Sequence, residues 1–327
     1  MPITSVEKNL DALTMTVVAD FVATRERLWE AYTDPRQIEK FWGPPEWPAT
    51  FTRHDVFVGG RSAYFMTGPQ GERSAGFWEF LAVDDGTFFE VRDGFAGDDG
   101  EENSAMPSMR MTFSFEDTGD GSRLVTTTHF GSVDQLQQLL DMGMEAGMAA
   151  AMGQIDQVLA DLASFAVGSG TELHILSDTQ VRISRIIRGT VEQVWRAHHD
   201  PELVTQWMLG PDGWTMPVCE VATEVAGAYR YEWEPDDVSA DGSPGRFGFE
   251  GELLESDPPH RAVTTERMIG VEGSGTTNEM TLTPRTGGTL LSLVITYPSA
   301  AVRDMVLETG MVGGMETSYA RLEANLD

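Results

Sequence analysis

The sequence predicts an α+β protein of two tandem domains, each a curved antiparallel sheet of about six or seven strands around a long C-terminal helix. Three observations lead to this prediction. A stretch with a central Asp-Pro pair occurs twice, as Leu28–Trp42 and Val194–Met208. A Gly-Met-x-x-Gly-Met pattern near the end of each half, Gly143–Met148 and Gly310–Met315, repeats at almost the same spacing. Between them lie short β-branched and aromatic runs separated by turn residues, and such a repeat indicates a duplicated unit.

The Asp-Pro stretch predicts two short helices after the first strand. Leu28, Trp29 and Tyr32 recur at helical spacing and share one face. Asp34 can cap a second helix, and Pro35 suits its first turn, where a missing N–H costs nothing. The second copy repeats this pattern, so two short helices are expected to close one end of each sheet.

The remaining elements follow in order in each half. In the first half we expect strands at Met15–Ala23, Pro48–Val58, Arg61–Met66, Gly76–Val83, Thr87–Val91, Met109–Phe115 and Arg123–Phe130, and a helix at about Val133–Leu162. In the second half we expect strands at Val181–Ile187, Trp214–Val221, Ala228–Trp233, Phe247–Leu254, Ala262–Met268, Asn278–Leu282 and Thr289–Tyr297, and a helix at about Ala300–Leu326. We therefore assign residues 1–165 to the first domain, 166–176 to a linker and 177–327 to the second domain.

Composition narrows the class of protein. The chain has 327 residues, 41% of them hydrophobic, and a formal net charge of −30. No apolar run reaches the roughly 20 residues that span a bilayer, and the N-terminus lacks the pattern of a signal peptide. We expect a cytoplasmic protein without membrane insertion. The negative charge disfavours nucleic acid, whereas a basic protein partner stays open.

Metal and cofactor binding are not expected. The single cysteine, Cys219, excludes an internal disulfide and argues against a cysteine zinc site. No Gly-x-Ser-x-Gly elbow, phosphate-binding loop or His-Glu-x-x-His motif occurs.

Four local patterns in this order resemble a known family. They are the repeated Asp-Pro stretch, the hairpin Gly59–Met66, the turn Asp257–Arg261 and the glycine-methionine helix. Together they resemble the C-terminal domain of the heat-shock-protein ATPase activator homologues, a branch of the START-like, birch-pollen-allergen-like helix-grip superfamily. The resemblance implies a hydrophobic cavity between sheet and helix that takes small apolar molecules. Eukaryotic co-chaperones of the family combine this domain with a separate N-terminal domain, for which we find no counterpart in this sequence.

Candidate cavity residues come from the hairpin strands, the short helices and the terminal helices. The apolar candidates are Trp42, Tyr64, Met66, Trp78, Met144, Met148, Trp207, Tyr229, Tyr231, Trp233, Met311 and Met315. The polar candidates, which could anchor a ligand head group if they face inward with a partner, are His54, Glu79, Arg110 and Arg267. The alternatives are ordinary core filling for the first group and solvent exposure for the second.

Binding of a small hydrophobic molecule is the preferred function, for sequestration, transport, sensing or a stress or resistance role. The second half is the preferred binding half, because Tyr229, Tyr231 and Trp233 stand where the first half has Ser62, Tyr64 and Met66. One alternative is a cyclase or aromatase that acts on a polyketide-like chain. Another is a co-chaperone that uses the acidic surface.

Overall fold

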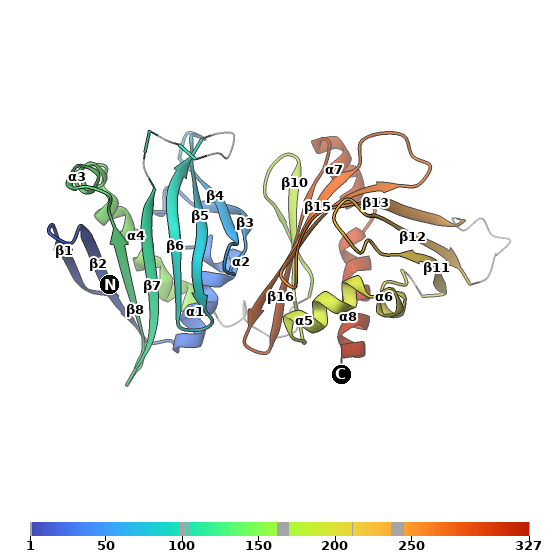
Figure 1. Ribbon diagram of the computed structural model, residues 1–327, viewed down its shortest axis with the longest axis horizontal. Helices are drawn as coiled ribbons and strands as arrows, with labels where there is room; N and C mark the ends of the chain where they lie inside the picture. Colours follow the sequence, from blue (N-terminus) through green and yellow to red (C-terminus); the bar gives the residue numbers. More distant parts are fainter. Residues whose placement is uncertain are drawn as a thin grey trace. The chain divides into compact units, whose positions relative to one another are not determined.

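The computed structural model describes residues 2–97, 102–103, 105–106, 108–161, 170–210, 212–236 and 245–326. The chain separates into two compact units, Met1–Phe165 (unit 1) and Ala166–Asp327 (unit 2) (Figure 1). Of the predicted linker, residues 166–169 lie outside the described part, whereas Glu172–Ile175 form a strand.

Unit 1 contains an eight-stranded antiparallel sheet in the order β1-β2-β8-β7-β6-β5-β4-β3. Its strands are β1 (Ile3–Asn9), β2 (Thr14–Phe21), β3 (Ala49–His54), β4 (Arg61–Thr67), β5 (Arg73–Asp84), β6 (Phe88–Ala96), β7 (Met109–Thr118) and β8 (Gly121–His129).

Unit 2 repeats the arrangement in the order β9-β10-β16-β15-β14-β13-β12-β11. Its strands are β9 (Glu172–Ile175), β10 (Gln180–Ile187), β11 (Trp214–Glu220), β12 (Ala228–Pro235), β13 (Phe247–Asp257), β14 (Arg261–Met268), β15 (Thr276–Arg285) and β16 (Gly288–Thr296). The predicted fold class and antiparallel topology are confirmed.

Each sheet has one edge strand that the sequence did not predict, β1 in unit 1 and β9 in unit 2. Almost all residues of both strands are exposed. An exposed edge strand is held mainly by backbone hydrogen bonds, so it lacks the alternation of apolar and polar residues that predicts a strand. The short helices consequently follow the second strand of each unit rather than the first.

The paired short helices form where the sequence predicts them. They are α1 (Arg25–Thr33) and α2 (Pro35–Ile38) in unit 1, and α5 (Val191–His199) and α6 (Pro201–Trp207) in unit 2. The side chain of Asp34 accepts a hydrogen bond from the Arg36 N–H, and Asp200 does the same for Glu202. Each aspartate therefore ends one helix and caps the next.

The long terminal helix predicted in each unit is broken in two. Unit 1 has α3 (Val133–Asp141) and α4 (Met144–Ala160), and unit 2 has α7 (Ala300–Glu308) and α8 (Met311–Leu326). Gly143 and Gly310 lie at the breaks with φ of 88° and 80°. This left-handed conformation ends a helix and is accessible to glycine at little cost.

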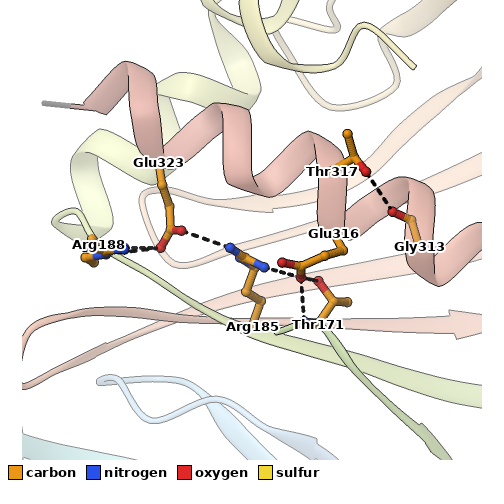
Figure 2. A network of polar contacts seen from close by, with 7 residues as sticks. All are labelled: Thr171, Arg185, Arg188, Gly313, Glu316, Thr317 and Glu323. Carbon is orange, nitrogen blue, oxygen red and sulfur yellow. Dashed lines mark hydrogen bonds and ion pairs between the residues drawn. The ribbon is translucent and has the colours of Figure 1, made fainter. Parts of the chain in front are cut away.

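The terminal helix α8 is fastened to β10 by ion pairs (Figure 2). The Arg185 guanidinium pairs with Glu316 and Glu323, two residues of α8. Arg185 belongs to the face of β10 that also carries Val181 and Ile183, and these two pack near Met311 and Met315 of the helix. The helix therefore covers this concave face of the sheet in unit 2.

The cores of the two units differ in continuity. In unit 1 one large cluster of buried side chains joins the sheet, α1, α2 and α4. In unit 2 the buried apolar residues fall into three clusters: one around Tyr319 and Leu322, one around Ile183 and Tyr297, and one around Val204 and Trp233. Half-buried apolar side chains lie at the margins of these clusters. The buried side chains of unit 2 thus form separate groups, and the half-buried Met208, Leu293 and Met315 each border two of them.

Candidate functional site

A row of paired residues crosses the concave face of unit 1. Ser62 on β4 lies opposite Trp78 on β5, which lies opposite Asp93 on β6. Trp78 is fully buried, and its indole N–H donates to the Asp93 carboxylate at 2.8 Å. Burial raises the pKa of Asp93 to about 6, although the indole bond acts in the opposite direction. Unit 1 thus carries an inward-facing carboxyl group that changes charge near neutral pH.

The equivalent row in unit 2 carries a carboxyl group at the same place. Tyr229 on β12 lies opposite Gly251 on β13. Because Glu250 pairs with Arg267, Glu266 on β14 lies across from Gly251. Asp93 and Glu266 therefore hold matching positions on the third strand of matching rows.

Glu266 is surrounded by polar groups of the concave face. Burial raises its pKa, while hydrogen bonds from Asn278 and Tyr229 lower it. The Tyr229 hydroxyl lies 3.5 Å from a Glu266 carboxylate oxygen, but it donates at 2.8 Å to the Thr265 carbonyl oxygen. The Glu266 charge also raises the pKa of Tyr297, after a larger effect of burial. These groups converge from β12, β14, β15 and the end of β16.

In the first two positions of the row, the large and the small residue stand in opposite order in the two units. Trp78 fills the second position in unit 1, where unit 2 has Gly251. A Cβ atom on Gly251 would lie 2.7 Å from a ring carbon of Tyr229, so the Tyr229 ring lies over this glycine. Tyr229 in turn stands where unit 1 has Ser62. The aromatic ring beside the acid therefore comes from β5 in unit 1 and from β12 in unit 2.

The apolar candidates of unit 1 pack on the concave side. Trp42 and Trp78 make an edge-to-face contact with ring centroids 4.6 Å apart, and Tyr64 stacks on Phe51 at 5.0 Å. Trp42, Tyr64, Met66, Met144 and Met148 are half-buried around the unit 1 core. The six apolar candidates of unit 1 therefore lie together in the structure, and Trp78 is part of the core itself.

The apolar candidates of unit 2 divide among its three clusters. Trp207 donates to the Ala197 carbonyl oxygen at 2.9 Å and stacks on Tyr319. Trp233 donates to the Met208 carbonyl oxygen at 2.6 Å and packs near Tyr231. The rings of Tyr231 and Tyr229 lie 5.1 Å apart.

The two methionine candidates of α8 lie by the other clusters. Met311 contacts the cluster around Tyr297, and Met315 contacts both this cluster and the one around Tyr319. Met315 therefore lies between two separate parts of the core.

Three of the four polar candidates lie outside the concave face. The side chains of Arg110 and Arg267 are 60% and 61% exposed and pair with Glu90 and Glu250. Glu79 neighbours the inward-facing Trp78 along β5, so it points to the other face, where it binds Arg92 at 2.8 Å. We leave these three out of the proposed site.

His54 is the polar candidate on the concave side. It is buried, and its two ring nitrogens lie 2.8 Å from the Ser62 hydroxyl and 3.0 Å from the Tyr32 carbonyl oxygen. Both nitrogens are therefore occupied by bonds that join β3 to β4 and α1, which gives the residue a structural role.

Asp93, Glu266 and Tyr297 were missed as inward-facing polar residues. A signal was present for Asp93, since Phe89, Val91 and Asp93 alternate along one strand in the same phase. An acid in phase with buried apolar residues faces the core. Glu266 stands in a strand with several polar residues, and its direction depends on strand pairing.

Replacing Asp93 by asparagine is expected to stabilise the protein near neutral pH. The folded-state pKa of about 6 lies above the reference value of 3.8, so this carboxyl group favours folding below pH 3.8 and loses that contribution as the pH rises through 6. The shift corresponds to at most roughly 3 kcal/mol, less where solvent reaches the carboxylate. We expect D93N to exceed the wild type near pH 7 by about 1–3 kcal/mol and to equal it near pH 4.

The measurement is the free energy of unfolding between pH 4 and 8. Asparagine keeps the oxygen that accepts from Trp78, so packing is preserved. The matched variant E266Q in unit 2 should show a difference of the same sign, because burial raises the pKa of Glu266 as well. Parallel pH profiles for D93N and the wild type would contradict the assignment.

A surface pocket of about 450 Å³ occurs elsewhere in unit 1. It lies where the β7–β8 turn meets the end of β2 and Asp156 of α4, and it includes the ion pair between Asp20 and Arg123. The pocket is open to solvent, and charged side chains, among them Asp120 and Asp156, contribute to its lining, so we do not assign an apolar ligand to it.

Among the described residues, no group of three or more His, Cys, Asp or Glu side chains is arranged to hold a metal ion. Within the same residues, no helix has both the length and the apolar character needed to cross a membrane.

The order of elements defines the class of protein. In each unit an antiparallel sheet is covered on its concave face by a C-terminal helix and carries two short helices between its second and third strands. Each unit is therefore an α+β domain of the helix-grip type.

The family follows from the comparison with family models. The model described as Activator of Hsp90 ATPase homolog 1-like protein matches residues 22–160 and 188–327. These two segments make up most of the chain, so the chain belongs to this family and contains two copies of its domain. The resemblance seen in the sequence is confirmed.

Solved structures similar to this chain each cover one domain's length. A crystal structure of a protein from Mycobacterium smegmatis is 45% identical, covers 49% of this chain and 98% of its own, and has a TM-score of 0.47. A solution structure from Arthrobacter aurescens is 40% identical, covers 48% and 92%, and has a TM-score of 0.47. A crystal structure from Rhodobacter sphaeroides is 28% identical, covers 48% and 98%, and has a TM-score of 0.44. A comparison with curated proteins gave no match.

Proposed function

We propose that the protein binds a small hydrophobic molecule between the concave face of the unit 2 sheet and helix α8. The observation that carries the proposal is the divided core of unit 2, in which three buried clusters replace the single cluster of unit 1. A bound apolar molecule would join these clusters and remove their half-buried side chains from water. Burial of apolar surface contributes about 25 cal/mol per Å².

The terminal helices differ in how many side chains they bury. In α4 four side chains are buried, Met152, Ile155, Val158 and Leu159. In α8 only Tyr319 and Leu322 are buried. Both helices carry half-buried methionines in their N-terminal part, so it is the smaller number of buried side chains in α8 that favours unit 2. The flexible side chains of Met311 and Met315 can adapt to a guest.

The proposal can be tested with diphenylhexatriene, a hydrocarbon probe without polar groups. We expect its fluorescence to rise on binding and to saturate at one probe per chain. Met315→Trp adds volume between two core clusters and should weaken binding at least about tenfold, which corresponds to 1.4 kcal/mol.

The matched control is Met148→Trp, the equivalent position in unit 1, which should leave probe affinity unchanged. Circular dichroism of both variants checks that they fold. If no probe binds, the proposed function is wrong. If M148W weakens binding and M315W does not, the binding half is unit 1.

A cyclase or aromatase reaction is the second candidate, because Asp93 and Glu266 provide carboxyl groups with raised pKa. An acid whose pKa lies near the working pH can both give and take a proton. Incubation with a linear poly-β-ketone thioester tests this, with product profiles compared among the wild type, D93N and E266Q. If the wild-type protein gives the same products as the thioester incubated without protein, this candidate function is excluded.

A further inference from the structure

Besides the ion pairs of Arg185 with α8, unit 2 carries a second group of polar side chains on its concave face. Glu266 on β14 adjoins Asn278 on β15, Tyr229 on β12 lies one strand further from Glu266 on the other side of β13, and Tyr297 follows β16. Tyr297 belongs to the same buried cluster as Val181, Ile183 and Ile295, which is bordered by Met311 and Met315 of α8. This polar group therefore lies beside the space to which we assign the apolar ligand.

The Tyr297 hydroxyl is buried without a hydrogen-bond partner. The residue is 3% exposed, and its oxygen contacts no donor or acceptor at bonding distance among the described residues. Buried polar groups in native proteins are nearly always paired, and an orphan hydroxyl calls for an explanation such as a missing ligand. Burial raises the pKa of Tyr297, and the charge of Glu266 raises it further.

Glu266 also has unused capacity to accept hydrogen bonds. The Tyr229 hydroxyl proton is directed to the Thr265 carbonyl oxygen at 2.8 Å, so its 3.5 Å approach to Glu266 is weak. Asn278 provides a further bond. An ionised carboxylate has about four acceptor sites, so at least one remains for a donor from a ligand.

Unit 1 provides an internal comparison. Asp93, at the matching position, already accepts the Trp78 indole N–H at 2.8 Å. In unit 2 the residue in the place of Trp78 is Gly251, which has no side chain to donate. Unit 1 also has buried hydroxyls without a hydrogen-bond partner, on Thr126 and Thr128, but its acid accepts the Trp78 N–H. Only in unit 2 do an under-used acid and an orphan phenol occur together among the described residues.

We propose that Glu266 and Tyr297 bind the hydroxyl head group of an otherwise apolar ligand in unit 2. The ligand hydroxyl donates to the Glu266 carboxylate and accepts from the Tyr297 phenol, so that both groups gain a partner. The apolar body lies toward Met311 and Met315. A ligand carboxylate is repelled by Glu266, and a plain hydrocarbon gives neither group a new partner. The inference rests on the proposed function and names the ligand class that its site takes.

The test is displacement of diphenylhexatriene by four chains of equal length: dodecanol, dodecylamine, dodecanoate and dodecane. Dodecylamine and dodecanoate are kept below their critical micelle concentrations, and dodecanol and dodecane below their solubility limits. We expect dodecanol to displace the probe at about tenfold lower concentration than dodecane or dodecanoate, since one hydrogen bond of this kind is worth about that factor. Tyr297→Phe should remove most of the preference for dodecanol over dodecane without changing the affinity for dodecane. Glu266→Leu should remove it as well.

A purely structural role for Tyr297 is excluded by a second measurement. Because its hydroxyl has no partner in the free protein, Y297F should leave thermal stability equal or higher in the absence of ligand, and should lose the extra stabilisation by dodecanol. Thr126→Val is the matched control in unit 1, because it also removes a buried hydroxyl without a partner, and it should leave the dodecanol preference unchanged.

The outcomes separate the two proposals. If the hydrocarbon probe binds but dodecanol has no advantage over dodecane, or if Y297F retains the advantage, the head-group inference is overturned while the proposed function stands. A preference for dodecylamine over dodecanol would also overturn it, in favour of a cation site. If the probe does not bind at all, the proposed function fails first.

Discussion

Replacing Arg185 by alanine is expected to lower the free energy of unfolding of unit 2 by about 3 kcal/mol. Arg185 is 5% exposed and holds two glutamates of α8, including Glu323 at 2.9 Å (Figure 2). Removing one partner of a buried ion pair leaves the other charge without compensation, and this costs more than the pair itself contributes. Glu316 is partly exposed and can regain water, which places the loss at the lower end of the usual range.

The effect reaches the first residues of the unit as well as the helix. Glu316 also accepts hydrogen bonds from the backbone N–H and the hydroxyl of Thr171, at 2.7 and 2.8 Å. Without Arg185, nothing on β10 holds this carboxylate in place through an ion pair among the described residues. We expect α8 and the chain around Thr171 to lose protection from amide hydrogen exchange together.

Arg188→Ala is the matched control for Arg185→Ala. Its side chain is 67% exposed and approaches Glu323 only to 3.9 Å. Its backbone N–H still donates to Glu323 in the variant, at 3.0 Å in the present structure. Exposed pairs of this kind contribute about 0–1 kcal/mol.

The measurement is urea unfolding of the full chain, analysed for two transitions because two units need not unfold together. Equal losses for R185A and R188A would show that the network does not fasten the helix.

Replacing Trp78 by alanine is expected to destabilise unit 1 by about 3–5 kcal/mol. Trp78 is fully buried at the centre of the aromatic cluster and contacts Trp42 edge to face. Its loss leaves a cavity whose surroundings include strands β4 to β7, and these cannot close it without moving the sheet. The same change removes the donor to Asp93, so the pKa of that carboxyl group should rise further above 6.

Two variants separate the contributions of Trp78. Trp78→Phe keeps most of the ring volume and removes the N–H, so we expect a loss of about 1–3 kcal/mol that is greatest near pH 7, where Asp93 is charged. Trp195→Ala removes a half-buried indole of unit 2 that stacks on His199 at 3.9 Å, and should cost clearly less than W78A. A W78A loss no larger than that of W195A would contradict the central position of Trp78 in the core.

Local signals were sufficient for most of the secondary structure. The capping aspartates and the following prolines predicted both helix pairs, because capping depends on neighbouring residues. The hydrophobic alternation predicted β2–β8 and β10–β16. The sequence did not predict that the terminal helices break at Gly143 and Gly310, because a glycine inside a helical pattern can also continue the helix.

The candidate site was predicted less completely than the fold. Aromatic residues such as Trp42, Tyr64 and Tyr231 could be placed on inward faces from strand phase and helical period. The charged candidates Arg110 and Arg267 could not be oriented in the same way, because an arginine on a strand is compatible with either face. Their pairing with Glu90 and Glu250 on neighbouring strands became visible only with the register.

The sequence by itself determined that the protein is a duplicated α+β unit with capped helix pairs, because a repeat, a cap and an alternation are properties of residues close in the chain. Only the tertiary structure decided that Asp93 and Glu266 occupy matching places. It also decided that the Trp78 indole donates a hydrogen bond to Asp93, whereas Gly251 has no side chain that could donate to Glu266. The division of the buried core of unit 2 into three clusters likewise became visible only there. These features depend on which residues of different strands lie opposite one another, and strand register is set by packing across the whole sheet.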